Sequence, residues 1–206
     1  MYGSADLIEP VFRRTVMRVV LRRTRMDRLL MLIVSWLHHW VQGLAKAIWP
    51  GLFLPDLVIL KVQKVGWDEE FENERRMYNR LKPLQGTVIP TLNGETVFYG
   101  RPALVLSYID GASLHKARHL EVSEVEQMLK DAYQALAVHG VDQEDINLDN
   151  FIVVDGRIVT LDMEEMVEPP DADEIDFAAY SVVDALVYNF KLRKELRPSP
   201  TGVFRK

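Results

Sequence analysis

Cysteine is absent from this sequence of 206 residues. Its absence excludes disulfide bridges and thiolate metal sites, and it fits a reducing compartment. No signal peptide is evident, because the first apolar run comes late and no small-residue cleavage site follows it. We therefore expect an intracellular, cytoplasmic protein.

Acidic residues are scarce at the start of the chain and abundant afterwards. Residues 1–50 hold eight Lys/Arg against three Asp/Glu, a net charge of about +5, whereas the remainder holds 17 against 27, about −10. An acidic main part argues against nucleic acid as a partner. The change in charge predicts a boundary near Pro50 to Pro55, so that residues 1–55 form a separate basic and apolar segment.

This N-terminal segment has no uninterrupted apolar run of the length that a membrane span needs, about 20 residues. Residues 11–28 are rich in arginine with apolar residues between, and we interpret them as a helix. Residues 29–49 are apolar, but paired histidines, Gln42 and Lys46 would be costly inside a bilayer. Two interpretations remain open: peripheral membrane contact through residues 11–49 by an interfacial helix, or a helix that packs on the main domain.

The chain after residue 55 predicts alternating strands and helices. A β-rich run predicts a strand at Leu57–Val62, and Asp68 can cap a helix that reaches about Lys82. The further elements predicted are strands at 96–99 and 102–108 and helices at 123–139 and 175–190. Together they indicate an α+β fold.

A β-hairpin is predicted by two short apolar runs, 151–154 and 158–161, that are separated by Asp155-Gly156. Asn150 lies just before the first run, and Asp162 lies just after the second. Because the ends of a hairpin lie side by side, an amide and a carboxylate can meet there at one ion. Magnesium prefers such oxygen ligands.

Three further polar residues complete a pattern that suits phosphoryl transfer, which needs a cation on the phosphates, Mg²⁺ and a carboxylate beside the attacking hydroxyl. Asp145 lies five residues before Asn150, the spacing of a protein-kinase catalytic loop. Lys61 ends a predicted strand, and Glu74 lies thirteen residues later in the next predicted helix.

In this combination the chain resembles the protein-kinase-like superfamily over residues 57–190, and in particular the compact kinase-like proteins of filamentous fungi. Leu84–Pro90, Tyr108–Gly111 and Asp149–Phe151 support the resemblance. It implies a reduced N-lobe sheet in residues 56–110 and a mainly helical, shortened C-lobe in residues 111–206, preceded by the extra N-terminal helical segment.

The resemblance also implies ATP and Mg²⁺ as cofactors and assigns roles to individual residues. Residues 104–108 would form the hinge that contacts adenine. The residues implied for the site are Lys61 on the phosphates, Glu74 as its ion-pair partner, Asp145 as the base, Asn150 and Asp162 as metal ligands, and Leu106 and Tyr108 at the nucleotide.

The sequence departs from the family pattern in three places. Residues 1–56 contain no glycine-rich loop, so we expect the arginine-rich segment to replace the two strands that usually cover the phosphates. Gln143-Glu144 stands where His-Arg usually precedes the base; because that His bonds the metal-binding loop, we expect a weaker brace. Met163-Glu164 follows Asp162 in place of Phe-Gly.

Three functions remain open. The first is an ATP-dependent kinase that transfers phosphate to a protein Ser/Thr hydroxyl. The second is a pseudokinase that serves as a binding or scaffold module, and the third is a small-molecule phosphotransferase. The sequence leaves open the acceptor, the oligomeric state, and whether the chain is a truncated kinase.

Overall fold

The structure is a computed structural model that describes residues 5–7, 15–169 and 172–196. The chain divides into two compact units. The sheet unit comprises residues 1–71 and 90–108, and the helical unit comprises residues 72–89 and 109–206. Among the described residues, no helix combines the length and the apolar character that crossing a membrane requires.

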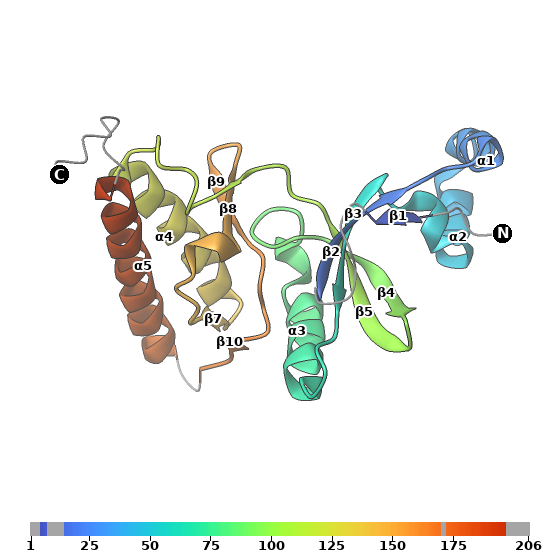
Figure 1. Ribbon diagram of the computed structural model, residues 1–206. Coiled ribbons are helices and arrows are strands. Elements are labelled where there is room, and N and C mark those ends of the chain that lie inside the picture. Colours follow the sequence, from blue (N-terminus) through green and yellow to red (C-terminus); the bar gives the residue numbers. More distant parts are fainter. Residues whose placement is uncertain (1–4, 8–14, 170–171, 197–206) are drawn as a thin grey trace, which may run out of the picture. The chain divides into compact units, whose positions relative to one another are not determined.

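The sheet unit is built on five antiparallel strands in the order β1-β2-β3-β5-β4 (Figure 1). Alternate residues of the central strands face one side and form a small core of Met17, Val19, Val58, Leu60, Val62 and Ala103. The strands are β1 (Ala5–Leu7), β2 (Val16–Leu21), β3 (Leu57–Val62), β4 (Leu92–Phe98) and β5 (Arg101–Ser107).

The helix expected over residues 11–28 is wrong at Val16–Leu21, which is strand β2. Residues 11–14 of that prediction lie outside the described residues, and a helix begins only at Arg25. Its side chains alternate between buried and exposed: Met17 and Val19 are buried, while Arg18 is exposed. Alternation of this kind suits a half-buried strand, and β-branched valine favours one. The expected loss of the covering strands is wrong as well, since β1 pairs with β2, and β2 pairs with β3 so that Val16 lies opposite Lys61.

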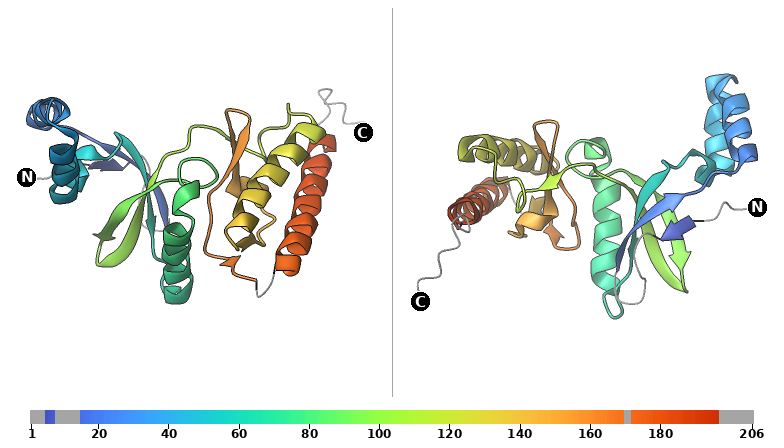
Figure 2. Two further views of the ribbon diagram at one scale, coloured as in Figure 1. Left: turned by 180° about the vertical axis from the view of Figure 1, so that it is seen from behind. Right: turned by 45° about the horizontal axis from the view of Figure 1, so that its top comes forward.

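Residues 22–56 leave the sheet between two neighbouring antiparallel strands and return to it. The Leu21 backbone N–H donates to the Asp56 carbonyl at 2.8 Å, which closes the excursion at its base. Its helices, α1 (Arg25–Ser35), α2 (His39–Ile48) and the 3₁₀ helix η1 (Pro50–Phe53), lie beyond the ends of β2 and β3 (Figure 2). We call residues 22–56 the helical excursion.

The helical unit has a core between its two long helices and a β-hairpin. Helix α4 (Val122–Val138) packs beside α5 (Ala172–Glu195), and the hairpin consists of β8 (Phe151–Val154) and β9 (Arg157–Thr160). Large buried side chains such as Leu129, Phe151 and Phe190 fill the core. The remaining elements are α3 (Asp68–Arg80), which begins in the sheet unit, η2 (Lys82–Leu84), β6 (Ala112–Ser113), β7 (Asp142–Gln143), η3 (Leu148–Asn150) and β10 (Met166–Val167).

The predicted hairpin and the α+β class are confirmed. Asp155 (φ 50°) and Gly156 (φ 71°) both have positive φ, as a tight two-residue hairpin turn requires. Gly111 is needed for another reason: a Cβ there would collide with the Val153 carbonyl oxygen and the Ile152 side chain. The chain can therefore enter β6, which pairs with β8, only through a glycine.

Candidate active site

The loop between β7 and β8 is closed on itself by hydrogen bonds around Asp145. One carboxylate oxygen of Asp145 accepts from the Asn147 backbone N–H at 2.7 Å, and the other accepts from the Asn150 side-chain amide. The Asn147 side chain in turn accepts from the Asp149 backbone N–H at 3.1 Å. The structure thus brings two predicted site residues, Asp145 and Asn150, into direct contact.

Asp162 follows the hairpin at the same end. Phe151 pairs with Thr160, and the Leu161 backbone N–H donates to the Asn150 carbonyl at 2.8 Å. Leu161, the residue directly before Asp162, is therefore hydrogen-bonded to Asn150. This confirms the predicted adjacency of the two hairpin ends. Three polar residues that are separated in the sequence gather at one end of β8 and β9.

Gln143 braces Asp162 from within the core. Its side-chain amide donates to the Asp162 carbonyl at 2.6 Å, and its own carbonyl accepts from the Tyr133 hydroxyl at 3.0 Å. Gln143 is fully buried, and β7 pairs with β10 so that Gln143 lies opposite Met166. The weaker brace expected from the missing histidine stays a prediction; the structure shows that the glutamine amide supplies a donor to the loop that carries Asp162.

Carboxylates gather around Asp162. Carboxylate oxygens of Glu74, Asp162 and Glu164 lie within 4.8 Å of one another. Glu74 is fully buried, and the Glu164 backbone N–H donates to the Asp162 carboxylate at 3.1 Å. Burial, and then the charges of Glu74 and Asp162, raise the pKa of Tyr78 well above its usual value. Hard oxygen donors of this kind suit Mg²⁺.

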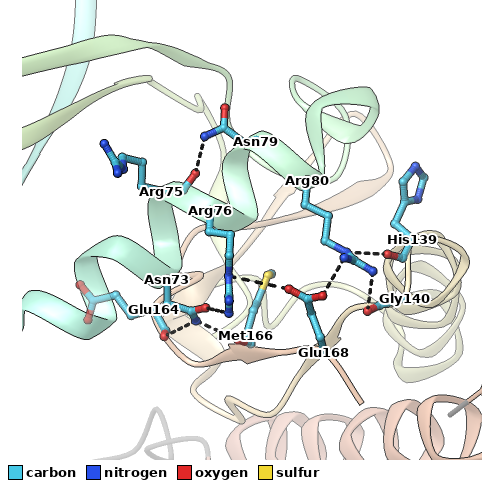
Figure 3. A network of polar contacts seen from close by, with 10 residues as sticks. All are labelled: Asn73, Arg75, Arg76, Asn79, Arg80, His139, Gly140, Glu164, Met166 and Glu168. Atoms are coloured by element: carbon cyan, nitrogen blue, oxygen red, sulfur yellow. Dashed lines mark hydrogen bonds and ion pairs between the residues drawn. The ribbon is translucent and has the colours of Figure 1, made fainter. Parts of the chain in front are cut away.

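Glu164 was not among the sequence-predicted site residues, although its place two residues after Asp162 is a usable signal. Its backbone is held by α3: the Asn73 side-chain amide donates to the Glu164 carbonyl at 3.0 Å and to the Met166 carbonyl at 2.9 Å. Figure 3 shows this network, in which Arg80 binds the Glu168 carboxylate at 2.7 Å and the His139 carbonyl at 2.9 Å. Helix α3 therefore fixes the course of the chain after Asp162.

The loop between β7 and β8 is also held by residues in and just after β6, a contact that the sequence did not predict. The Ser113 hydroxyl donates to the Asp149 carboxylate at 2.9 Å, and the His115 ring Nδ1 lies 3.8 Å from the other oxygen of that carboxylate. No spacing in the sequence links these residues, because strand pairing between β6 and β8 brings them together.

The other three predicted residues lie in the sheet unit. Lys61 is 5% exposed and lies opposite Leu104 of β5, and Leu106 is likewise buried. The Arg18 guanidinium sits 4.5 Å from the centroid of the Tyr108 ring. Since Lys61 and Glu74 belong to different units, their ion pair stays a prediction, as do the nucleotide contacts of Leu106 and Tyr108.

Comparisons with known proteins bear on the family and the fold of the chain. The family model described as "APH: Phosphotransferase enzyme family" matches residues 55–199. A crystal structure of a mutant of the Mycobacterium tuberculosis PknI kinase domain superposes with a TM-score of 0.52 at 16% identity and covers 88% of this chain and 71% of that one. A crystal structure of the PknI kinase domain gives a TM-score of 0.49 at 20% identity, with 65% and 64% covered.

No curated protein matches the sequence significantly. At these identities the solved structures show the fold alone, and that fold is kinase-like. The resemblance to the protein-kinase-like superfamily is therefore confirmed, whereas the likeness to fungal proteins in particular has no support among these matches.

Proposed function

The chain belongs to the phosphotransferase enzyme family, and from this premise we propose that it binds ATP with Mg²⁺ and transfers a phosphoryl group to a hydroxyl acceptor. The observation that carries the proposal is the hydrogen-bonded end of the β8–β9 hairpin. There Asp145 holds Asn150, and the backbone of Asn150 is bonded to the residue that precedes Asp162.

Each residue has a role that its surroundings favour. Asp162 and Asn150 offer oxygen ligands for the metal, and Glu164 and Glu74 add carboxylates around Asp162. Asp145, partly exposed at the tip of the loop, would accept the proton of the attacking hydroxyl. Bound Mg²⁺ and ATP would supply charge neutralisation and the transferable phosphoryl group.

Lys61 is proposed as the cation that binds the nucleotide phosphates, with Glu74 as its partner and Leu106 and Tyr108 at the adenine. The resemblance to kinases supports these roles. Burial of the Lys61 ammonium favours a fixed anionic partner over solvent, because a buried charge without a partner is costly. The requirement for ATP favours an intracellular location.

Two acceptors fit the proposal. A protein Ser/Thr hydroxyl is favoured by the kinase-like fold, and a small-molecule hydroxyl is favoured by membership of a phosphotransferase family that is not restricted to protein kinases by its description. With either acceptor, Asp145 would accept the proton of the attacking hydroxyl. The two acceptors therefore differ in the molecule that binds beside the loop and not in the chemical step.

The test is thermal unfolding of the full chain with ATP, with and without Mg²⁺. A ligand at one hundred times its Kd raises the free energy of unfolding by about 2.7 kcal/mol, and we expect a matching rise in Tm only when Mg²⁺ is present. Asp162→Ala should abolish the Mg²⁺-dependent part. Asp131→Ala, which removes an exposed carboxylate from α4, is the matched control and should keep it.

The absence of any Mg²⁺-dependent rise in Tm would overturn the proposal. Nucleotide binding without phosphate transfer to water, protein or small hydroxyl acceptors would instead identify a pseudokinase. The second outcome is separable from the first because binding and transfer are measured independently.

A further inference from the structure

The helical excursion exposes apolar side chains that the fold does not use. Helix α1 contains no buried residue, although most of its side chains are apolar. Trp36 is 86% exposed, Trp40 in the first turn of α2 is 65% exposed, and Trp49 directly after α2 is 61% exposed. The other large exposed apolar residues of the excursion are Met26, Leu29, Leu30, Leu32, Ile33, Leu37, Leu44 and Ile48.

This surface is preformed. The Thr24 hydroxyl accepts from the Asp27 backbone N–H at 3.1 Å, and the Asp27 carboxylate accepts from the Thr24 backbone N–H at 2.7 Å, a reciprocal capping box at the start of α1. At the base, the Arg23 guanidinium binds the Asp56 carboxylate at 2.6 Å and the carbonyls of Leu52 and Leu54. Helix α1 and the base of the excursion are therefore held by local hydrogen bonds that do not depend on burying apolar faces.

The surface is also basic. The helical excursion, residues 22–56, contains five Lys/Arg against two Asp/Glu, a net charge of about +3, within a chain of net charge −5. Arg22, Arg25 and Arg28 are exposed around the start of α1. Arg22 and Arg28 also line a hollow between the end of β2, α1 and η1, together with apolar side chains such as Met31 and Leu32.

We propose that the helical excursion docks on the surface of a membrane that contains anionic lipid. Three exposed tryptophans among aliphatic side chains, beside a cluster of arginines, are the composition of a helix that lies in the membrane interface. Helices α1 and α2 have 11 and 10 residues and are too short to span a bilayer, so the excursion would lie on one leaflet. The positive charge selects anionic headgroups over a neutral protein surface.

The position of the excursion in the chain makes this docking compatible with the fold. It leaves and re-enters the sheet between paired strands, and the Leu21–Asp56 backbone bond closes it below the helices. None of the residues in the small core of the sheet unit belongs to it. Docking can thus occupy α1 and α2 without breaking a strand pair.

The experiment uses the full chain and sedimentation with two kinds of vesicle, phosphatidylcholine alone and phosphatidylcholine with phosphatidylserine. We expect binding to the vesicles that contain phosphatidylserine, weakened by salt, with a shift of tryptophan fluorescence to shorter wavelength. Brominated lipid acyl chains should also quench the tryptophan fluorescence of the bound protein, because Trp36 and Trp40 would lie at the boundary between the headgroups and the acyl chains.

Two pairs of substitutions test the two parts of the surface. Loss of one basic side chain near an anionic surface lowers partitioning about fivefold, so Arg25→Gln with Arg28→Gln should lower it about 25-fold. Trp36→Ala with Trp40→Ala should lower it at least as much and remove the bromine quenching. The matched controls are Arg157→Gln and Tyr180→Ala, exposed residues of the helical unit, which should bind vesicles as the parent chain does.

Several outcomes would overturn the proposal: no sedimentation with either vesicle, equal binding to both vesicles at all salt concentrations, or binding unchanged by the paired substitutions. Light scattering could instead show that the parent protein is a dimer and that Trp36→Ala makes it a monomer. Together with no vesicle binding, that result would assign the surface to contact with a second copy of the chain. Each variant should retain its Mg²⁺-dependent response to ATP, so failure here is distinct from failure of the proposed phosphotransferase activity.

Discussion

The loop at the end of the β8–β9 hairpin and the helical excursion use their side chains in opposite ways. In the loop, polar groups are bonded to one another and to buried neighbours: Asp145 to Asn150, and Gln143 to the backbone of Asp162. In the excursion, apolar groups stand in solvent, and α1 buries none of its residues. The polar groups of the loop thus find hydrogen-bond partners within the chain, whereas the apolar side chains of α1 are not buried by the described residues.

The largest expected effect concerns the loop. Asp145→Asn should leave the Mg²⁺-dependent response to ATP intact and lower phosphate transfer by a factor of about 10²–10⁴, the usual contribution of a general base. Turnover is measured as ATP consumption with and without acceptor. A carboxamide matches the shape of the carboxylate, although its single oxygen can accept only one of the two hydrogen bonds that Asp145 receives from Asn147 and Asn150.

Glu144→Gln is the control for Asp145→Asn, because Glu144 is the exposed neighbour and no metal or base role is assigned to it. If Asp145→Asn transferred phosphate at the parent rate, Asp145 would not be the base.

A matched pair of leucines sharpens the comparison between the regions. Leu129 on α4 is fully buried, and Leu29 on α1 is 50% exposed. Leu129→Ala should lower the free energy of unfolding by about 2–5 kcal/mol, because it leaves a cavity. Leu29→Ala should change it by less than about 0.5 kcal/mol, as is usual at the surface. Urea unfolding of both variants gives the two values.

A large cost of Leu29→Ala would break the comparison. It would show that α1 is covered by some other part of the chain, which is the packing alternative that the sequence left open.

A smaller effect is expected at the brace of Asp162. Gln143→Leu removes the donor to the Asp162 carbonyl and leaves that oxygen without this bond in a buried place, at a cost of about 1–3 kcal/mol. Loss of a residue that orients a metal ligand lowers metal affinity about 10–100-fold. Titration of Mg²⁺ in the presence of ATP measures the affinity.

Gln143→His should restore most of that affinity, since its ring can donate to the same carbonyl. Equal Mg²⁺ affinity in Gln143→Leu and the parent chain would show that the brace is only structural.

The smallest effect is a dependence of stability on pH. Burial raises the pKa of the Asp142 carboxyl above its usual value, the Gln143 backbone N–H opposes the rise, and the charge of Glu144 adds to it. A raised pKa means that the folded chain holds this proton at a pH where the unfolded chain has lost it. The free energy of unfolding therefore falls as pH rises from the unfolded pKa to the folded pKa.

Asp142→Asn should remove that fall, so the variant should gain stability relative to the parent chain between about pH 4 and pH 7, the side on which the unfolded carboxyl is ionised. Urea unfolding at several pH values checks the gain, and Asp131→Asn on the surface is the control. A difference between variant and parent that does not change with pH would contradict the raised pKa.

The predictability of the fold from sequence differed between the same two regions. The strand Leu57–Val62 and the hairpin with Asp155-Gly156 were found because their signals are local: a run of β-branched residues and a turn that needs positive φ. The helix over residues 11–28 was wrong, because arginine is common in helices and the short alternation around Met17 and Val19 was outweighed.

Site prediction had the same limits. The adjacency of Asn150 and Asp162 was predicted because a hairpin places its two ends side by side, and the catalytic and metal roles of Asp145, Asn150 and Asp162 stay predictions. The contacts of Ser113, Asn73 and the Gln143 side chain were missed, since they depend on which strands and helices pack against the loop. Glu164 stood beside a predicted ligand, but its closeness to Glu74 required the fold of α3.

The sequence by itself determined the kinase-like arrangement of polar residues, because the order and spacing of Asp145, Asn150 and Asp162 are properties of one short stretch of chain. The tertiary structure decided how that stretch is held and which side chains of the basic segment are exposed. A hydrogen bond between residues that are distant in the sequence ties the Gln143 side chain to the Asp162 carbonyl. Strand pairing places part of the expected basic helix in β2, and the helix that follows, α1, buries none of its residues.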